Sequence, residues 1–258
     1  MLLRRLVLFC LLVATPVRAQ APGASSRLDE IIARGTLRVG LTGDYRPFSV
    51  LDKSTGEYSG LDVDAAHNLA QALGVKLEIV PTTWASLVAD ALSSKFDIGM
   101  GGISVTLERQ KSAFFSTPVM RTGKAAIARC TDKDRFDTLP AIDQPSTRVI
   151  VNPGGTNERF DRGSLRQAQI MVFPDNAHIF DELASGHADV MITDSVETRL
   201  QQKMHPDLCA IHPDQTFDFG ELAYLLPRDM ALKLFVDQWL HISTENGSFP
   251  KLAQHWLE

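Results

Sequence analysis

The sequence predicts an α/β protein of two lobes that close on a cleft between them. Helix and strand patterns alternate with short connections along the 258 residues, which is typical of sheets covered by helices. The alternation begins again after Cys130, and the chain is longer than one common domain. We expect one lobe to comprise residues 26–124 and 219–258, and the other residues 125–218.

The elements of the first lobe carry start and stop signals. Ser26, with Asp29 three residues later, is typical of a helix start, while Gly35 and Gly74 are typical of helix ends. These signals and the apolar periodicity predict, in order, a helix over 26–34, a strand over 36–41, a turn over 43–48, a helix over 61–73, a strand over 75–80, a helix over 85–93 and a strand over 96–100.

The second half predicts the same alternation. The segments are strands over 147–151, 169–173 and 190–193, helices beginning at 156, over 178–184 and over 197–204, and finally a strand over 222–226 with helices over 230–242 and 249–257. Short connections of this kind predict parallel sheets. Ligands bind beyond the carboxyl ends of such strands, so we expect the site between the two lobes.

The first 19 residues are typical of a cleaved signal peptide. Arg4 and Arg5 precede an apolar run over 6–14, and a small residue, Ala19, suits the cleavage site. The run is shorter than the roughly 20 residues that span a bilayer, which disfavours the alternative of an uncleaved anchor. Cleavage removes three arginines and lowers the formal charge from −5 to −8. We expect no membrane insertion after cleavage and, from the acidic charge, no nucleic-acid partner.

Two cysteines, Cys130 and Cys209, remain after Cys10 leaves with the signal peptide. In an oxidising compartment they predict one disulfide bond, worth about 4–5 kcal/mol by the chain-entropy account. A reactive thiol or a metal site is disfavoured because there is no C-x-x-C spacing. We expect the bond to lie near the crossings between the lobes, at the base of the second lobe.

Two aromatic residues follow predicted strands of the first lobe and are candidates for the cleft. Tyr45 offers a ring with a polar tip, which suits a ring-bearing ligand, or it belongs to an ordinary turn. Trp84 is either a wall of the cleft or part of the core.

The segment 101–109 combines glycines with a cation. Gly101 and Gly102 allow backbone N–H groups to approach a ligand, and Thr106 is placed to cap a short helix. Arg109 then falls in the first turn, where the helix dipole disfavours a cation, so a ligand carboxylate is a natural partner. The alternative is a surface ion pair with Glu108 or another acid.

Two further candidates come from the second lobe and from the crossing between the lobes. Residues 152–156 begin with Asn152 and place two glycines and Thr156 at a helix start, which is an anion site or an ordinary cap. Lys124, at the crossing, is either solvated or the partner of a second carboxylate.

Asp194 and Glu197 fit two different interpretations. Their spacing is that of a capping box, in which the glutamate binds back to the helix start. Alternatively, Glu197 faces the closed cleft, where burial would keep its carboxyl protonated as a proton donor. The residues alone do not decide. There is no G-x-S-x-G elbow, Walker loop or H-E-x-x-H, and no histidine pair at metal spacing, so we expect no metal site.

From Leu28 onward the chain resembles the polar-amino-acid class of periplasmic solute-binding proteins. Four motifs carry the resemblance: residues 34–40, 60–64, 96–99 and 107–109. The class implies a type II binding-protein fold in the periplasm, with two lobes and a hinge. It also implies a ligand α-carboxylate held by Arg109, with backbone N–H groups near Ser104 and Thr156.

Within this class the chain is most similar to the cyclohexadienyl dehydratases, through residues 42–45, 150–158, 208–213 and 237–242. That resemblance implies prephenate and arogenate as substrates, no cofactor and Glu197 as the general acid. It also places Tyr45, Trp84, Arg109, Lys124, Asn152 and Thr156 in the cleft. We expect Gly102, Ser104 and Asp194 to bind the substrate with them. The alternatives are a binding protein that delivers an amino acid to an importer, or a sensor domain.

Overall fold

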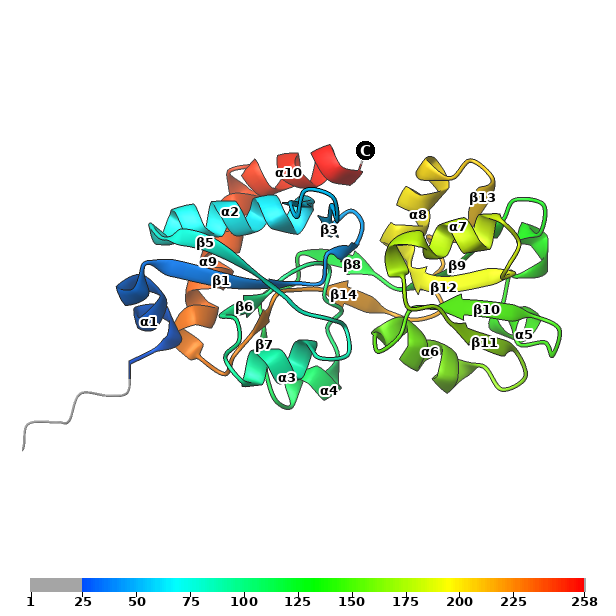
Figure 1. The fold of residues 1–258 in the computed structure, drawn as a ribbon, viewed down its shortest axis with the longest axis horizontal. Coiled ribbons are helices and arrows are strands. Elements are labelled where there is room, and N and C mark those ends of the chain that lie inside the picture. The colour runs from blue at the N-terminus through cyan, green and yellow to red at the C-terminus, as the bar shows by residue number, and fades with distance from the viewer. Residues whose placement is uncertain (1–24, 258) are drawn as a thin grey trace, which may run out of the picture.

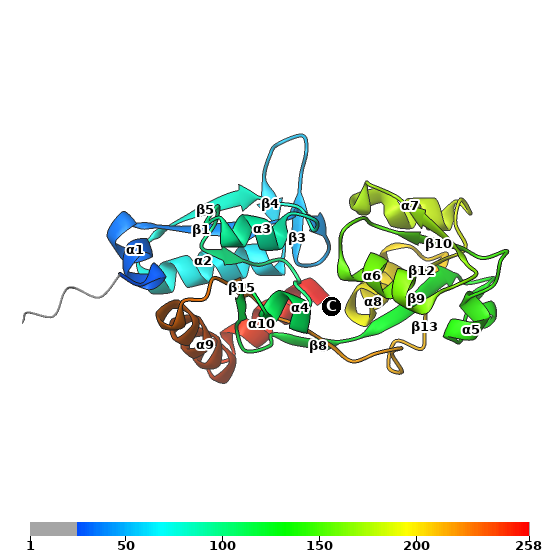
Figure 2. The ribbon, with the colours of Figure 1, turned by 90° about the horizontal axis from the view of Figure 1, so that it is seen from below.

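A computed structural model describes residues 25–257 and contains two five-stranded sheets, one after the other along the long axis of the molecule (Figure 1). Helices cover the faces of both sheets, as the view from below also shows (Figure 2). The predicted signal peptide lies outside the described residues. None of the helices within residues 25–257 is long and apolar enough to cross a membrane.

The first sheet has the order β5-β1-β6-β15-β7. Its strands are β1 (Thr36–Leu41), β5 (Lys76–Pro81), β6 (Ile98–Gly99), β7 (Phe114–Phe115) and β15 (Leu225–Leu226). Strands β5, β1 and β6 are parallel, but β15 is antiparallel to both its neighbours. The prediction of a purely parallel sheet is therefore wrong, because β15 enters this sheet on the return from the second lobe.

Helices pack around this sheet, and a small separate sheet follows β1 along the chain. The helices are α1 (Arg27–Arg34), α2 (Leu61–Leu73), α3 (Leu87–Leu92), α4 (Leu107–Gln110), α9 (Met230–Glu245) and α10 (Ser248–Leu257), and the small sheet has β2 (Asp44–Tyr45), β3 (Ser49–Leu51) and β4 (Tyr58–Ser59). Ser26 and Asp29 form the predicted capping box, and Gly35 and Gly74 end their helices in left-handed conformations. The helix bounds predicted from these signals are confirmed.

The second sheet has the order β11-β10-β12-β9-β13. Its strands are β9 (Lys124–Arg129), β10 (Arg148–Val151), β11 (Gln169–Val172), β12 (Val190–Asp194) and β13 (Leu208–Ile211), and its helices are α5 (Leu139–Ile142), α6 (Thr156–Ser164), α7 (Ile179–Ala184) and α8 (Ser195–Met204), with 3₁₀ turns at η1 (Lys133–Arg135) and η2 (Asn176–His178). The strand β9 is antiparallel to β12 and β13, so this sheet is also mixed. The sequence predicts no strand at the positions of β9 and β13.

A two-stranded ribbon of β8 (Met120–Thr122) and β14 (Gly220–Leu222) lies between the two sheets (Figures 1 and 2). The single strand predicted over 222–226 is wrong. The chain leaves the ladder at Ala223 and Tyr224, whose N–H groups bind Ile103 O and Ser116 Oγ at 3.0 Å each. Because this ribbon divides the return path, β14 belongs to the connection and β15 to the first sheet.

The two crossings between the sheets are bonded to each other. Lys124 N donates to Asp218 Oδ1 (2.6 Å), and Phe217 N donates to Lys124 O (2.7 Å). A Cβ at Gly123 would lie 2.3 Å from Asp218 O, so the close approach of the two backbones requires glycine. The domain boundaries predicted at 124 and 218 stay a prediction, and these contacts lie beside both.

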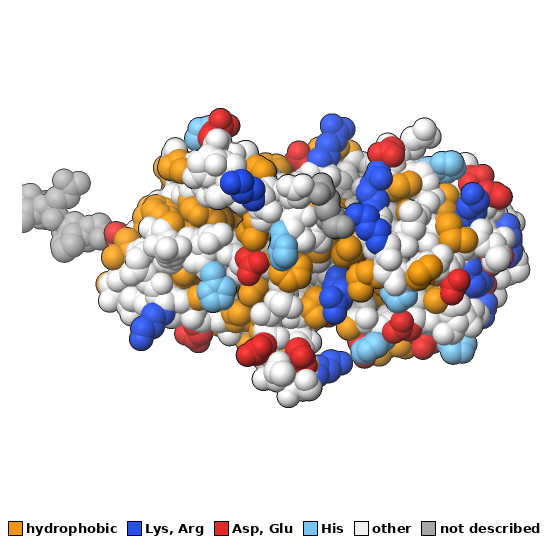
Figure 3. Space-filling model, turned by 90° about the horizontal axis from the view of Figure 1, so that it is seen from above, with side chains coloured by type: hydrophobic (Ala, Val, Ile, Leu, Met, Phe, Trp, Pro, Cys, Tyr) orange, Lys and Arg blue, Asp and Glu red, His pale blue; other side chains and the backbone are white. Residues whose placement is uncertain are grey.

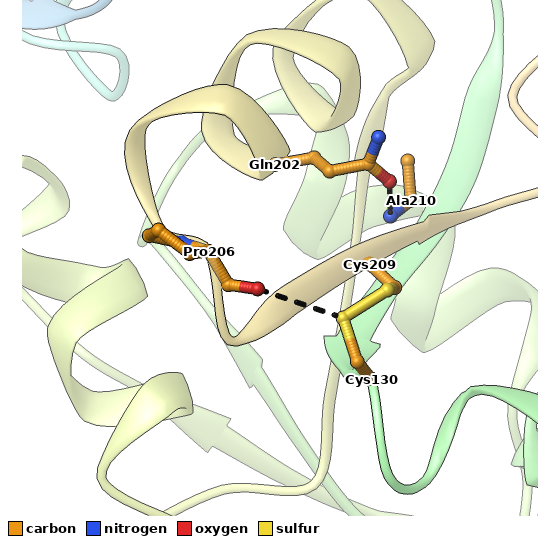
Figure 4. The surroundings of a disulfide bond; sticks show 5 residues. All are labelled: Cys130, Gln202, Pro206, Cys209 and Ala210. Carbon is orange, nitrogen blue, oxygen red and sulfur yellow. Dashed lines mark hydrogen bonds between the residues drawn. A yellow bond between two sulfur atoms is a disulfide. The ribbon is translucent and has the colours of Figure 1, made fainter.

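Cys130 and Cys209 form a disulfide bond, with their Cα atoms 4.8 Å apart (Figure 4). Cys209 belongs to β13, and Cys130 directly follows β9. The expected position near the crossings is wrong, because β9 carries the chain six residues beyond Lys124, roughly 20 Å at the rise of a strand. The bond therefore joins the ends of two neighbouring strands far from the ribbon.

On the face shown in Figure 3, acidic and basic side chains are interspersed.

Candidate active site

Eleven residues from both lobes line a cavity between the two sheets. They are Tyr45, Trp84, Gly102, Ser104, Asn152, Gly155, Thr156, Asn157, Asn176, Asp194 and Glu197. Eight of the predicted site residues are thus brought together, and Arg109 and Lys124 lie just behind this lining. The space in the cavity that the centre of a water molecule can occupy is about 20 Å³, enough for one or two water molecules. A six-membered ring cannot enter without movement.

Direct hydrogen bonds hold the two lobes closed over this cavity. Tyr45 Oη donates to Asp194 Oδ2 at 2.8 Å, and the hydroxyls of Ser104 and Thr156 are 3.1 Å apart. Asn176 adds a bond between its Nδ2 and the carbonyl oxygen of Asp44, at 2.9 Å. Opening the lobes therefore breaks side-chain contacts made by residues that also line the cavity.

Glu197 is the most deeply buried acid of the cavity, with 3% of its surface exposed. Burial raises the pKa of its carboxyl to about 8, against an opposing hydrogen bond from Thr193 Oγ1 to Oε2 (2.5 Å). Within residues 25–257 it forms no ion pair, since Lys124, whose charge lowers this pKa from a distance, is paired with Asp194. The capping-box interpretation is wrong, because the side chain of the N-cap residue Asp194 makes no capping hydrogen bond and Glu197 lines the cavity.

Lys124 and Asp194 form a buried ion pair, with Nζ 2.9 Å from Oδ1. The same ammonium group donates to Thr156 Oγ1 (3.1 Å) and to Asn157 Oδ1. The three donors of Lys124 thus meet three oxygens of the chain, so the lysine is not solvated. A ligand carboxylate reaches this lysine by replacing one of them.

Arg109 lies behind the cavity, and 3% of its surface is exposed. Its Nη1 donates to Ser104 O at 2.7 Å, and its Nε has no partner among the described residues. Burial lowers the pKa of this guanidinium to about 10, so it stays charged at neutral pH. The surface pair with Glu108 does not form, because Glu108 binds Lys111 at 2.7 Å. The predicted cap is confirmed, since Thr106 accepts from Arg109 N.

The glycines at 101 and 102 do not offer their N–H groups to the cavity. Both donate to Asp62 Oδ2 at 2.8 Å, and Tyr224 Oη donates to Asp62 Oδ1 at 3.0 Å. The expectation of ligand contacts is wrong here, because a buried carboxylate from α2 takes these donors. Gly102 still shapes the cavity, since a Cβ there would lie 2.7 Å from the Tyr45 ring.

In the second glycine pair, Gly154 and Gly155, one of the two backbone N–H groups is also used within the chain. Gly154 N donates to Glu158 Oε2 at 2.7 Å, while Gly155 and Thr156 line the cavity at the start of α6. A Cβ at Gly154 would lie 2.8 Å from Ala85 of the other lobe. Glycine at 154 therefore permits the two lobes to meet.

Trp84 and Asn157 tie the lining together. Trp84 is partly buried, packs against the core and lines the cavity. Its Nε1 donates to Asp44 Oδ1 (3.0 Å), and its ring lies edge-on to Tyr45. Asn157 Nδ2 donates to Thr193 Oγ1 (2.9 Å) and, more weakly, to Asn152 Oδ1 (3.3 Å).

The sequence prediction missed Asn157 and Asn176. Asn157 was within reach, because it lies in the segment 150–158 that carried the resemblance. Asn176 belongs to the 3₁₀ turn η2, which has no local pattern, and it meets the cavity only through the closed arrangement of the lobes. Within residues 25–257, no group of three or more His, Cys, Asp and Glu side chains is arranged to hold a metal ion.

The family of bacterial extracellular solute-binding proteins, family 3, matches residues 37–258. The chain belongs to this family. Across its whole length it is 51% identical to the cyclohexadienyl dehydratase of Pseudomonas aeruginosa, of which the match covers 94%. This family 3 protein is also 30% identical to the L-cystine-binding protein of Escherichia coli, over 89% of this chain and 85% of that one.

A solved structure has the same fold as this family 3 protein, with a TM-score of 0.83 and 37% identity, covering 90% of this chain and all of the other. It is an ancestral amino-acid-binding protein described as a precursor of cyclohexadienyl dehydratase. The predicted type II two-lobed fold and the predicted resemblance are confirmed.

Proposed function

We propose that the protein is a cyclohexadienyl dehydratase, a lyase that converts prephenate to phenylpyruvate and arogenate to phenylalanine. The observation that carries this proposal is Glu197: a buried carboxyl in the interlobe cavity, free of any ion pair within residues 25–257, with its pKa raised to about 8 by burial. An amino-acid carrier has no need of a proton donor there. The 51% identity to a named dehydratase supports the same conclusion.

The reaction requires an acid and no redox change. The ring loses its hydroxyl and its carboxylate, and the electron pair of the broken carbon–carboxylate bond completes the aromatic ring. Hydroxide is a poor leaving group, so a proton from Glu197 lets it leave as water. General-acid assistance of this kind is worth about 10²–10⁴-fold in rate.

The other lining residues orient the substrate in this proposal. Tyr45 and Trp84 flank the flattening ring, and their edge-on contact supports this role. Arg109 and Lys124 bind the two carboxylates, after a small movement that brings the unpaired Nε of Arg109 to the cavity and frees one donor of Lys124. Asp194, Asn152, Thr156, Ser104 and Gly102 complete the binding surface.

The carboxylate that leaves must not be held too tightly. Catalysis is favoured only by contacts that strengthen in the transition state, and carbon dioxide carries no charge. Lys124 is suited to this carboxylate, because Asp194 already competes for the same ammonium group. Closure of the lobes excludes water and brings Glu197 to the hydroxyl.

Mixing the purified protein with prephenate and measuring phenylpyruvate tests the proposal. We expect Glu197→Gln to lower kcat by about 10²–10⁴-fold while the affinity for prephenate stays within roughly tenfold. The matched control is Glu182→Gln, which changes a partly exposed acid of α7 that pairs with His187. This control keeps wild-type kcat.

Two outcomes contradict the proposal. Tight binding of an amino acid with no product from prephenate leaves a carrier of small molecules, the alternative to which the L-cystine-binding relative points. An equal loss of binding and turnover in Glu197→Gln assigns Glu197 a structural role.

We further propose that the protein works in the periplasm after removal of residues 1–19. Membership in an extracellular solute-binding family supports export. Mass spectrometry of the mature protein from the periplasmic fraction tests it, and we expect Gln20 as the first residue.

A further inference from the structure

The proposed reaction consumes one proton in each turnover. The hydroxyl leaves with the proton of Glu197 as water, and the carboxylate leaves as carbon dioxide without returning one. Glu197 is therefore a carboxylate after each turnover. It must take a proton from solvent before the next substrate reacts, and this argument rests on the proposed function.

The substrate side of Glu197 is a poor route for that proton. The substrate cavity has room for only one or two water molecules, with about 20 Å³ open to their centres. A bound substrate ring would stand between Glu197 and the rest of that cavity. The lobes are held together there by the bonds of Tyr45 to Asp194 and of Ser104 to Thr156. Protonation from this side would wait for the lobes to open.

Glu197 also lines a second space, on the side of β3 and η2. This space, here called the α8 pocket, is lined by Glu197, Gln201, Asn176, Asp44, Arg46, Val50, Leu51, Asp52, Lys53, Ser54, Ala177 and His178. The space in this pocket that the centre of a water molecule can occupy is about 300 Å³. Its outer residues, such as Lys53 and His178, are exposed. The pocket thus joins Glu197 to the surface without passing the substrate cavity.

Two buried amide groups lie in the α8 pocket beside Glu197. Gln201 is one turn after Glu197 on α8, so both side chains share one face of the helix. The side-chain oxygens of Gln201 and Asn176 are buried and accept no hydrogen bond from the described residues. Gln201 lines the pocket, and turning its amide over breaks no bond to this oxygen. A buried acceptor without a partner gains from a donating water.

We propose that Glu197 recovers its proton through the α8 pocket, along water molecules positioned by Gln201 and Asn176, while the lobes stay closed over the substrate side. Gln201 is a positioning residue in this scheme, because it acts on the water that reaches Glu197 and not on the substrate. The polar lining makes the pocket suited to ordered water.

The test compares Gln201→Leu with a control at the neighbouring, exposed position of the same helix. Gln202→Leu is that control, since Gln202 is exposed and its Oε1 binds Ala210 N near the disulfide (Figure 4). Rapid-quench measurements of phenylpyruvate at pH 7 follow the first and later turnovers separately. Glu197 begins protonated at this pH, so the first turnover needs no proton from the pocket.

In Gln201→Leu we expect a first turnover at the wild-type rate, with about one product per site, and then a steady state slower by roughly tenfold. Imidazole, whose small cation can enter the α8 pocket, restores the steady state, whereas a bulky buffer of the same pKa does not. Slow product release also gives a fast first turnover, but it does not respond to the buffer. Gln202→Leu behaves as the wild type does.

An equal fall of the first turnover and the steady state overturns the proposal and leaves Gln201 a structural role. Unchanged kinetics in Gln201→Leu also overturn it. If thermal unfolding shows that the leucine variant does not fold, Gln201→Met removes the same amide with a more adaptable side chain. If the wild type makes no phenylpyruvate, it is the proposed function that fails, before this route is in question.

Discussion

Each lobe buries a carboxyl group next to the cavity, and the two differ in the donors around them. In the first lobe Asp62 accepts from Gly101 N, Gly102 N and Tyr224 Oη. In the second lobe Glu197 accepts one bond, from Thr193 Oγ1. Burial raises both pKa values, but that of Asp62 reaches about 6 and that of Glu197 about 8.

The difference teaches that burial alone does not make a proton donor. Three donors favour the charged form, so Asp62 is mostly ionised near pH 7 and holds a loop in place. Glu197, with one donor and a neighbouring carboxylate at Asp194, stays protonated at the same pH. The same burial therefore gives a structural anchor in one lobe and a candidate acid in the other.

Removing the anchor is expected to give the largest effect on stability. Asp62→Ala leaves two N–H groups and one hydroxyl without their acceptor, which should cost about 3–5 kcal/mol of unfolding free energy. Chemical denaturation measures it. Asp62→Asn is the matched control, because its amide oxygen still accepts from both glycines, and it should lose less.

Turnover per folded molecule separates the two carboxyls. In Asp62→Asn it should stay far above that of Glu197→Gln. If the two variants lose turnover equally while both stay folded, the contrast between anchor and acid is wrong.

The activity of the wild type should fall at high pH. The pKa of Glu197 is raised from 4.5 to about 8, so the donor is protonated below pH 8, and log kcat/KM should fall by about one per pH unit above it. Steady-state assays from pH 6 to 10 measure this fall, which is the high-pH limb of the pH–rate profile. The same shift gives a stability contribution that is complete below pH 4.5 and is lost as the pH rises through 8.

Asp161 provides the control for this limb. Burial raises its pKa to about 8 as well, but it lies in α6 outside the cavity lining. Asp161→Asn should leave the limb of activity in place and remove part of the loss of stability at high pH. Loss of the limb in Asp161→Asn would transfer the titration from Glu197 to Asp161.

The sequence predicted those parts of the fold that depend on local signals. The helices that end at Gly35 and Gly74 have the predicted bounds, because a cap and a left-handed glycine act within one turn. The strand β9 was missed, since it is rich in alanine and buried on both faces, so it has neither high β-propensity nor alternation. The antiparallel strands follow from the path between the lobes, which no local pattern encodes.

The candidate site was predicted by residue but not by contact. Tyr45, Trp84 and Glu197 meet in the cavity as expected. The occupation of the Gly101 and Gly102 N–H groups by Asp62 could not be predicted, because the partners are about 40 residues apart. The wrong expectation arose because a glycine pair after a strand has the same sequence whether its N–H groups bind a ligand or a carboxylate of the chain.

The smallest expected effect comes from the single donor of Glu197. The Thr193 hydroxyl favours the ionised carboxyl and lowers its pKa, so Thr193→Val should move the high-pH limb of kcat/KM to higher pH. At pH 7 Glu197 is already protonated, and kcat should stay within a few-fold of the wild type; at pH 9 the variant should be the faster enzyme. Thr198→Val is the control, since its hydroxyl binds Ser195 O on the same helix and it does not line the cavity. A limb that moves to lower pH would mean that Thr193 stabilises the protonated acid, and the contrast with Asp62 would then lie in the direction of the hydrogen bonds and not in their number.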